Sequence, residues 1–361
     1  MNNHNLNIPI AFACGKTMKN RFMLAPLTNK QSHEDGSLSE VELHWLTKRA
    51  EGQFGLVMTC ATSVQANGKC WSGQLGIHDD AHLPGHHRLV NKVHEQGSLV
   101  VTQLHHGGMR SDETLTGEKP VGPSDNEAEN VRGLSLAEVE KLRDDFIAAA
   151  VRAKAAGYDG VEVHGAHGYM ITQFISKEIN HRTDQYGGNL ENRSRLLFEI
   201  VEGIRQNCGD GFLLGVRLSP ERFGMDLLEI KVISQQLIDS SLIDFLDLSL
   251  WDVFKHNEAA KQSLMRFFVE ELDRKAVKLT VAGKVRGGEA VQKVLEAGID
   301  FVTIGTAAIL HHDFPTRVIN DPDFQMIQTP VTVEYLQNEG LGAPLIRYLQ
   351  ERWKDFVATP S

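Results

Sequence analysis

Cysteine is scarce in this chain of 361 residues, and the few cysteines lie far apart in the sequence. Cys14, Cys60, Cys70 and Cys208 form no Cys-x-x-Cys pair, which excludes the usual pattern of a zinc ribbon, an iron–sulfur cluster or a redox dithiol. We therefore expect free thiols without a chemical role, as in proteins of reducing compartments.

Long apolar runs and blocks of basic residues are also missing. No stretch reaches the ~20 apolar residues that a membrane span needs, and the first residues lack the cationic start and apolar segment of a secretion signal. We expect a cytoplasmic protein that does not interact with membranes. Lys and Arg number 37 against 47 Asp and Glu, which gives a formal net charge of −10. Nucleic acid is therefore not an expected partner.

The composition that is present belongs to an ordinary globular protein. Hydrophobic residues make up 41% and charged residues 23% of the chain, which argues against disorder or a fibre. At this length folding buries roughly three quarters of the surface of the unfolded chain, so no metal or disulfide is needed for stability. We find no internal repeat and no linker rich in Gly, Ser or Pro, and we expect one domain over residues 1–361.

Short apolar runs recur along the chain, and segments with helical spacing separate them. This alternation is typical of a parallel sheet covered by helices. Eight units predict a closed (β/α)8 barrel of the α/β class, because an open doubly wound sheet usually has five or six strands and often a G-x-G-x-x-G turn, which is absent here. The expected strands are Phe22–Pro26, Gly55–Cys60, Leu99–Leu104, Gly160–Val163, Phe212–Leu218, Ile243–Leu248, Lys278–Ala282 and Phe301–Gly305.

Two helix starts carry a capping signal. Ser135 and Glu138 have the spacing of a capping box, and Gly157 is expected to end the helix that they begin. Ser39 with Glu42 predicts the same arrangement at the first helix. A barrel needs ~250 residues, so the remainder is expected in the connections 105–134 and 164–189 and in the tail beyond residue 310.

In such barrels the chemistry is carried by the loops at the carboxyl ends of the strands. The residues at these positions include many neutral hydrogen-bond donors and few charged pairs. They are Ala25, Pro26, Leu27 and Thr28 after strand one, Ala61 after two, Gln103 at three, His164, His167 and Tyr169 after four, Arg217 at five, Trp251 after six, Gly283 and Lys284 after seven, and Gly305 and Thr306 at eight.

Gly283 and Gly305 stand where this architecture commonly holds a phosphate. Glycine allows close approach of the backbone, whose N–H groups bind the anion together with a helix N-terminus. The alternative is that both glycines only make tight turns between strand and helix.

Arg217 would be a costly buried charge at the end of a central strand unless it meets an acceptor. A reduced flavin fits, since its pyrimidine edge offers carbonyl oxygens and negative charge near N1, and Gln103 can orient that edge. The alternative is an interior ion pair between Arg217 and Glu162 on the neighbouring strand.

His164, His167 and Tyr169 form the most informative local pattern. Intervening glycines favour a loop, on which both imidazoles can donate to one carbonyl oxygen while the phenol acts as a neutral acid. The alternatives are structural histidines or, on a helix, a metal-binding pair. The histidines at 78, 82, 86 and 87 are expected mostly on a solvated loop and helix start, with no metal site.

Taken together, these motifs resemble those of the old yellow enzyme family of FMN-dependent oxidoreductases over nearly the whole chain. The resemblance rests on four segments, namely Ala25 to Thr28, Gln103 with His105 to Gly108, His164 to Tyr169, and His181 to Asn192. It implies a single-domain TIM barrel with non-covalent FMN at its carboxyl end.

By this resemblance, Ala25, Pro26, Leu27 and Thr28 would line the flavin ring, and Ala61, Gln103 and Arg217 would meet its pyrimidine side. Gly283, Lys284, Gly305 and Thr306 would hold the phosphate. Many members of the family have an arginine where this chain has Thr306, so either the hydroxyl and backbone amides would do more, or Lys284 or Arg286 would reach the phosphate. His164 and His167 would bind the substrate carbonyl, and Tyr169 would be the proton donor.

The implied activity is that of an ene-reductase. NADH or NADPH would reduce FMN in the same cleft, and flavin N5 would then pass hydride to the β-carbon of an α,β-unsaturated carbonyl or nitro compound. Two rival functions remain, namely a metal-dependent TIM-barrel hydrolase and a flavin-binding protein without turnover. A homo-oligomer is compatible with the sequence. Arg182, Asp184 and Tyr186 are expected to support the catalytic loop, ahead of a helix capped by Asn189.

Overall fold

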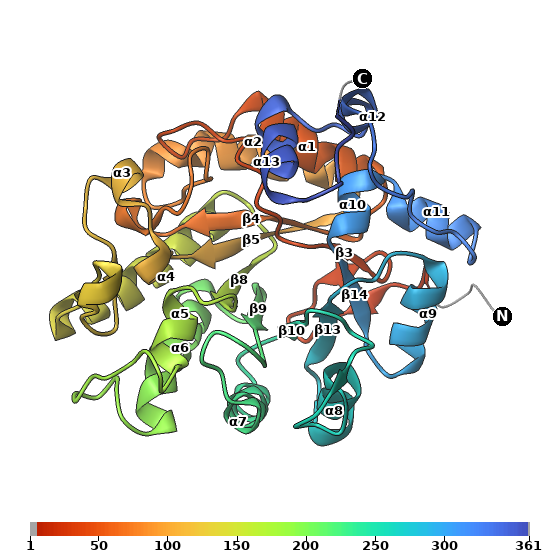
Figure 1. Ribbon diagram of the computed structural model, residues 1–361. Helices are drawn as coiled ribbons and strands as arrows, with labels where there is room; N and C mark the ends of the chain where they lie inside the picture. Colours follow the sequence, from red (N-terminus) through yellow and green to blue (C-terminus); the bar gives the residue numbers. More distant parts are fainter. Residues whose placement is uncertain (1–5, 360–361) are drawn as a thin grey trace.

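A computed structural model describes residues 6–359 and contains a closed barrel of parallel strands (Figure 1). The strand order is β10-β13-β14-β3-β4-β5-β8-β9, so each strand of the barrel pairs with its neighbours in the sequence. Every predicted apolar run overlaps one of these strands, which confirms the (β/α)8 barrel. The strands are β3 (Phe22–Leu24), β4 (Leu56–Ser63), β5 (Leu99–His105), β8 (Gly160–Gly165), β9 (Leu213–Leu218), β10 (Phe245–Ser249), β13 (Lys278–Ala282) and β14 (Phe301–Ile304).

Helices follow the strands and cover the outside of the barrel (Figure 1). They bury their apolar faces against the strands, which are themselves buried along nearly their whole length. The helices are α1 (Glu40–Glu51), α2 (Leu83–His94), α4 (Leu136–Ala155), α6 (Leu190–Cys208), α7 (Leu227–Asp239), α8 (Leu264–Glu271), α9 (Gly288–Glu296), α10 (Thr306–Leu310), α11 (Phe314–Asn320), α12 (Val333–Asn338) and α13 (Ala343–Arg352).

One of the two predicted capping boxes is complete. Ser135 and Glu138 satisfy each other's backbone N–H at the start of α4. Ser39 caps α1 through the N–H of Glu42, but the Glu42 carboxylate turns inward and accepts hydrogen bonds from Asn29 and Ser32. The second capping box is therefore only half formed, because the Glu42 carboxylate is bound by these buried side chains and does not accept from the backbone N–H of Ser39.

A hairpin at the start of the described chain closes one end of the barrel. Strands β1 (Ile10–Ala11) and β2 (Thr17–Met18) pair antiparallel. Phe12, in the turn, places its ring 6.1 Å from that of Phe245 and 5.9 Å from that of Phe301. These residues belong to a separate apolar cluster with Met23 and other side chains. The barrel is therefore sealed opposite the carboxyl ends of its strands.

The extra residues lie in the predicted connections. The segment after β5 contains η4 (Gly108–Arg110), α3 (Glu113–Thr116), β6 (Val121–Gly122), η5 (Glu127–Glu129) and β7 (Arg132–Gly133), and the segment after β8 contains α5 (Met170–Ile175). Shorter elements are η2 (Ala66–Gly68), η3 (Asp80–His82), β11 (His256–Asn257) and β12 (Gln262–Ser263). Over the described residues, the structure has no helix that is both long and apolar enough to span a bilayer.

The segment around Arg182 supports a different part of the molecule from the one expected. The Arg182 guanidinium donates to the carbonyls of Pro123 and Leu134, next to β6 and β7. It therefore fastens the insertion after β5 and not the loop 164–169. Asn189 caps α6, as predicted.

The histidines of segment 78–87 are more buried than expected. His86 is fully buried between the Tyr158 hydroxyl, 2.8 Å away, and the Gly76 carbonyl, 2.9 Å away. His82 is buried and its Nε2 lies 3.0 Å from the Asp35 carbonyl oxygen. Within residues 6–359, no three His, Cys, Asp or Glu side chains are placed to hold a metal ion together.

Candidate functional site

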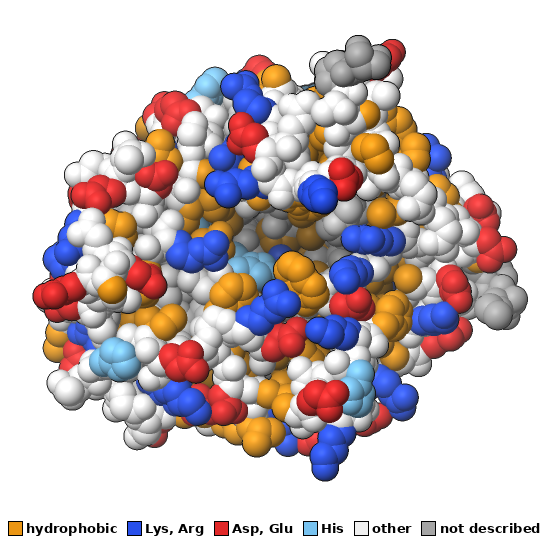
Figure 2. Space-filling model, viewed as in Figure 1, with side chains coloured by type: hydrophobic (Ala, Val, Ile, Leu, Met, Phe, Trp, Pro, Cys, Tyr) orange, Lys and Arg blue, Asp and Glu red, His pale blue; other side chains and the backbone are white. Residues whose placement is uncertain are grey.

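A central cavity of about 500 Å³ opens at the carboxyl ends of the strands. Figure 2 shows a hollow in the middle of this face, with histidine and hydrophobic side chains inside it and Lys and Arg side chains around it. The cavity is lined by Pro26, Leu27, Thr28, Ala61, Trp71, Gln103, Arg110, His164, His167, Tyr169, Phe223, Trp251, Ile309, Tyr348, Leu349 and Trp353.

Most of the residues predicted from the strand ends meet in this cavity. Nine of them line it, namely Pro26, Leu27, Thr28, Ala61, Gln103, His164, His167, Tyr169 and Trp251. Ala25 is buried beside Leu27, and Arg217 is buried on β9, next to His164 in the register of the sheet. Gly283, Lys284, Gly305 and Thr306 lie at the ends of the paired strands β13 and β14 and are not among the lining residues.

The two predicted histidines lie against each other. His164 Nε2 is 3.2 Å from His167 Nδ1, and His167 Nε2 is 2.6 Å from Ser249 Oγ. The backbone N–H of Ala166 donates to His164 Nδ1, so a neutral His164 carries its proton on Nε2. On the far side of Ser249, Arg217 Nη2 donates to Oγ across 3.3 Å.

Both imidazoles are neutral at physiological pH. Burial, together with the charge of Arg217, lowers the pKa of His167 to about 3. Burial and the neighbouring His167 hold the pKa of His164 well below its usual value. Because a neutral imidazole has one N–H, its neighbours decide which nitrogen carries the proton.

Tyr169 presents a phenol to the same cavity. Its ring lies 4.4 Å from the ring of His105 and 4.4 Å from the Arg110 guanidinium. Burial raises the pKa of Tyr169 to about 12. The phenol therefore keeps its proton across the whole physiological range and can act as a neutral acid.

The buried charge of Arg217 has a partner that the sequence did not indicate. Arg217 Nε lies 3.2 Å from Asp247 Oδ2, because Asp247 stands opposite Arg217 in the register of β9 and β10. The ion pair of Arg217 is therefore with Asp247 and not, as in the alternative considered from the sequence, with Glu162. Glu162 instead accepts a hydrogen bond of 2.7 Å from Gln103, and burial raises the pKa of Glu162.

Several buried polar atoms beneath the cavity lack a hydrogen bond within the described residues. They include Glu162 Oε2 and Asp247 Oδ1, whereas Arg217 Nε and Asp247 Oδ2 form no hydrogen bond but face each other as an ion pair. Because an unsatisfied buried polar group is costly, such a concentration indicates a place where a polar ligand binds.

The residues at strands β13 and β14 form an open backbone corner. Gly283 has φ +151°, and a Cβ there would lie 2.5 Å from the Leu250 carbonyl oxygen, so only glycine fits. A Cβ at Gly305 would meet nothing closer than 3.7 Å, which leaves its backbone accessible. Lys284 is paired with Asp252 at 3.3 Å.

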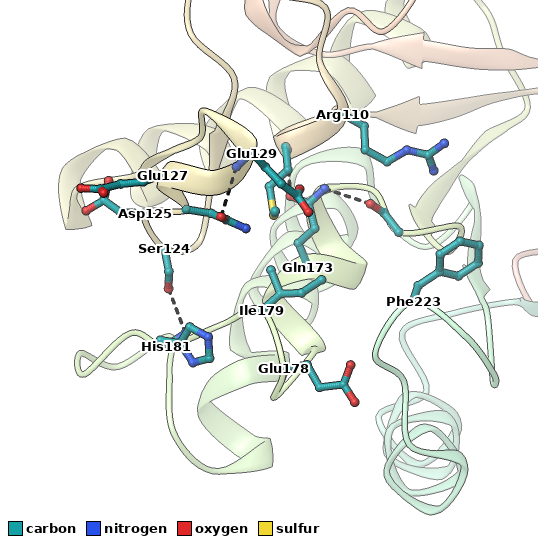
Figure 3. Close-up of a pocket in the computed structure, with 13 residues that line it drawn as sticks. Arg110, Ser124, Asp125, Glu127, Glu129, Gln173, Glu178, Ile179, His181 and Phe223 are labelled. Atoms are coloured by element: carbon teal, nitrogen blue, oxygen red, sulfur yellow. Dashed lines mark hydrogen bonds between the residues drawn. The ribbon is translucent and has the colours of Figure 1, made fainter.

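Two side cavities flank the central one. The acidic side cavity, about 770 Å³, is lined by Asp125, Glu127, Glu129 and Glu178, and by Arg110 and Phe223, which it shares with the central cavity. In Figure 3, Arg110 and Phe223 lie on one side of it and Asp125 and Glu127 on the opposite side. The basic side cavity, about 330 Å³, is lined by Thr28, Lys30, Cys70, Trp71, Arg110, Tyr169, Tyr348 and Arg352.

Part of the wall was not predicted from the sequence. Trp71, Arg110 and Phe223 come from loops that follow β4, β5 and β9, while Tyr348 and Trp353 come from the tail. Aromatic residues in the loops that follow strands could have indicated this wall from the sequence. The tail residues could not, because they do not directly follow a strand of the barrel. Trp251, for which packing was the commoner alternative, does line the cavity, and it stacks 4.2 Å from the Arg222 guanidinium.

Comparison with known proteins gives one consistent family. The model of the "NADH:flavin oxidoreductase / NADH oxidase family" matches residues 5–322. A probable NADH-dependent flavin oxidoreductase of Bacillus subtilis (strain 168) is 36% identical over 323 residues, which are 86% of each chain.

Solved structures agree with this match. The old yellow enzyme homologue of Zymomonas mobilis has a TM-score of 0.78 at 29% identity, covering 92% of this chain and 96% of its own. Morphinone reductase in complex with tetrahydroNAD has a TM-score of 0.79 at 26% identity, covering 92% and 94%.

Proposed function

The chain belongs to the NADH:flavin oxidoreductase / NADH oxidase family, the family of old yellow enzyme, and is an FMN-dependent NAD(P)H oxidoreductase; we propose that it reduces the double bond of an α,β-unsaturated carbonyl or nitro compound. The observation that carries this proposal is the meeting of His164, His167 and Tyr169 on one cavity. We further propose that residues 1–361 act as one FMN-binding domain in the cytoplasm.

The residues present fit non-covalent FMN. Buried acceptors without a hydrogen bond, Glu162 Oε2 and Asp247 Oδ1, lie beneath the cavity, and Gly283 and Gly305 open the backbone where a phosphate would bind. In our proposal Ala25, Pro26, Leu27 and Thr28 contact the flavin ring, Ala61, Gln103 and Arg217 its pyrimidine side, and Gly283, Lys284, Gly305 and Thr306 its phosphate. Bound FMN supplies a hydride acceptor for NAD(P)H and a hydride donor, N5, for the alkene.

The two histidines are suited to bind one carbonyl oxygen. The N–H of Ala166 sets the His164 proton on Nε2. In the structure the Nε2–H of His164 donates to His167 Nδ1 across 3.2 Å, so the His167 proton is on Nε2 and faces Ser249 Oγ. In our proposal a substrate oxygen replaces the bond between the two imidazoles, and His167 takes the tautomer with its proton on Nδ1 while Ser249 donates to its Nε2. Both N–H groups would then stabilise negative charge that develops on that oxygen.

Tyr169 holds the proton that the reaction consumes. Its hydroxyl forms no hydrogen bond within the described residues, and its raised pKa keeps it protonated. In the proposed step it gives this proton to the carbon α to the carbonyl, while the β-carbon receives hydride.

An absorption spectrum and an anaerobic titration test this function. We expect purified protein with a flavin spectrum that NADH or NADPH bleaches, and recovery of the oxidised spectrum with one equivalent of 2-cyclohexenone or a nitroalkene, together with saturated product. Colourless protein with stoichiometric zinc would favour the rival metal-dependent hydrolase. If NADH or NADPH bleaches the flavin but no added alkene restores the oxidised spectrum, the result would contradict ene-reduction.

A further inference from the structure

The basic side cavity concentrates positive charge in an acidic protein. Lys30, Arg110 and Arg352 line it, and no carboxylate does, although the chain as a whole has a net charge of −10. On the other side of Arg110, the acidic side cavity has the opposite character. An anionic ligand would therefore favour the basic side cavity, and a cationic ligand the acidic one.

These three cations have no carboxylate at ion-pair distance among the described residues, although Lys30 lies near enough to Asp112 to lower the pKa of that carboxyl. None of them forms a salt bridge with any residue between 6 and 359. Lys30 Nζ instead lies 5.3 Å above the ring of Tyr348, and the Arg110 guanidinium lies 4.4 Å above that of Tyr169. Like charges that share a hollow repel one another, and a bound anion would remove this repulsion.

A second observation points to a ligand that accepts hydrogen bonds. Trp71 is only 8% exposed and lines both the central and the basic side cavity. Its indole Nε1–H has no hydrogen-bond partner within the described residues. An indole can only donate, so its missing partner is an acceptor.

We propose that the basic side cavity binds the diphosphate of the nicotinamide coenzyme. This inference rests on the proposed function, in which the nicotinamide ring enters the central cavity. The two cavities share Thr28, Trp71, Arg110, Tyr169 and Tyr348, so one ligand can reach from one into the other. About 330 Å³ holds roughly ten water molecules, which suits two phosphate groups and leaves the adenosine outside.

Binding and reduction are tested with Lys30→Ala, Arg352→Ala and the double variant. Arg347→Ala, on the same helix α13 but outside the cavity, is the matched control. Calorimetry on oxidised holoenzyme gives the Kd of NAD⁺, NADP⁺ and inorganic pyrophosphate. Stopped-flow spectroscopy follows flavin reduction by NADH, NADPH and 1-benzyl-1,4-dihydronicotinamide, a donor that has no phosphate.

We expect each single variant to raise the Kd of the preferred coenzyme about 10-fold to 100-fold, the range for a hydrogen bond to a charged group. Pyrophosphate binding should be lost in the double variant. Reduction by the phosphate-free donor should stay within twofold of wild type in every variant, and Arg347→Ala should match wild type throughout.

Unchanged coenzyme affinity in the double variant would overturn the proposal. The proposal would also be overturned if the variants lost as much flavin reduction with the phosphate-free donor as with NADH or NADPH, because that result would indicate damage to the central cavity. If the variants bound a carboxylate-bearing enone more weakly but bound the coenzyme as wild type does, the cavity would be assigned to the substrate and the proposal would again be overturned. If no donor reduces the wild-type flavin, the proposed function fails, while the calorimetric result still decides whether this cavity binds diphosphate.

Discussion

Replacing Tyr169 with Phe separates the two half-reactions that we propose. The hydroxyl is the only group removed, and no hydrogen bond within the described residues is lost with it. We therefore expect the free energy of unfolding to change by less than about 0.5 kcal/mol. Flavin reduction by NAD(P)H needs no proton from Tyr169 and should stay within twofold of wild type.

Alkene reduction should slow by about 10² to 10⁴, the usual contribution of a positioned general acid, which corresponds to about 3 to 5 kcal/mol of barrier. Because burial raises the pKa of Tyr169 to about 12, the wild-type rate should be level between pH 6 and 9. An acid with the ordinary histidine pKa would instead lose rate through this range.

Tyr186→Phe is the matched control. The Tyr186 hydroxyl donates to Glu199 across 2.7 Å, away from the cavity, so its loss should cost about 1.5 kcal/mol in urea unfolding and leave both half-reactions unaltered. Anaerobic stopped-flow absorbance measures the two rates separately. Wild-type alkene reduction in Tyr169→Phe would refute the assignment of the proton donor.

Three further predictions concern the histidines and the glycine corner. His86 has its pKa lowered to about 4 by burial, so stability is lost as the pH falls below 6.5, and His86→Asn should reduce the loss between pH 7 and 5.5 by about 1.3 kcal/mol in urea titrations. Gly283→Ala would place a Cβ 2.5 Å from the Leu250 carbonyl oxygen, and we expect about 1 to 3 kcal/mol lower stability with weaker FMN binding in a fluorescence titration. Ser249→Ala removes the hydroxyl that would donate to His167 Nε2 and hold the proton on Nδ1 when a ligand is bound, and affinity for a phenolate ligand should fall about tenfold.

Each of these has an outcome that would contradict it. An unaltered pH slope in His86→Asn would mean that folding does not lower the pKa of this imidazole. Wild-type stability of Gly283→Ala would show that the backbone corner can shift. For Ser249, a threonine at the same position retains a hydroxyl and should restore ligand affinity, so equal losses in the alanine and threonine variants would argue against control of the tautomer.

The barrel was predictable because its strands are buried on both faces. A parallel strand covered by a helix outside and core inside is apolar along its length, and such runs are visible without knowledge of the partners. The β1–β2 hairpin escaped prediction, since two strands of two residues leave no such run. What fixes it is Phe12, whose partners lie more than 200 residues away.

The site was predictable to the extent that strand ends converge by geometry. Each residue that follows a strand could be assigned to the cavity end of the barrel without any knowledge of register. The partner of Arg217 could not, because Asp247 meets it only through the register between β9 and β10. The wall residues of the tail were also out of reach, since helix α13 is positioned by contacts with distant segments, such as Gly342 against Gln31.

The late position of Trp353 in the chain has a consequence for biosynthesis. The side chains that carry the proposed chemistry have been translated by residue 169, but the wall opposite them is incomplete until residue 353 leaves the ribosome. At about 5 to 20 residues per second, nearly 200 codons take roughly ten to forty seconds. During that interval a nascent chain exposes the side chains that the tail later covers, so chaperone occupancy should stay high until residue 353 has been translated.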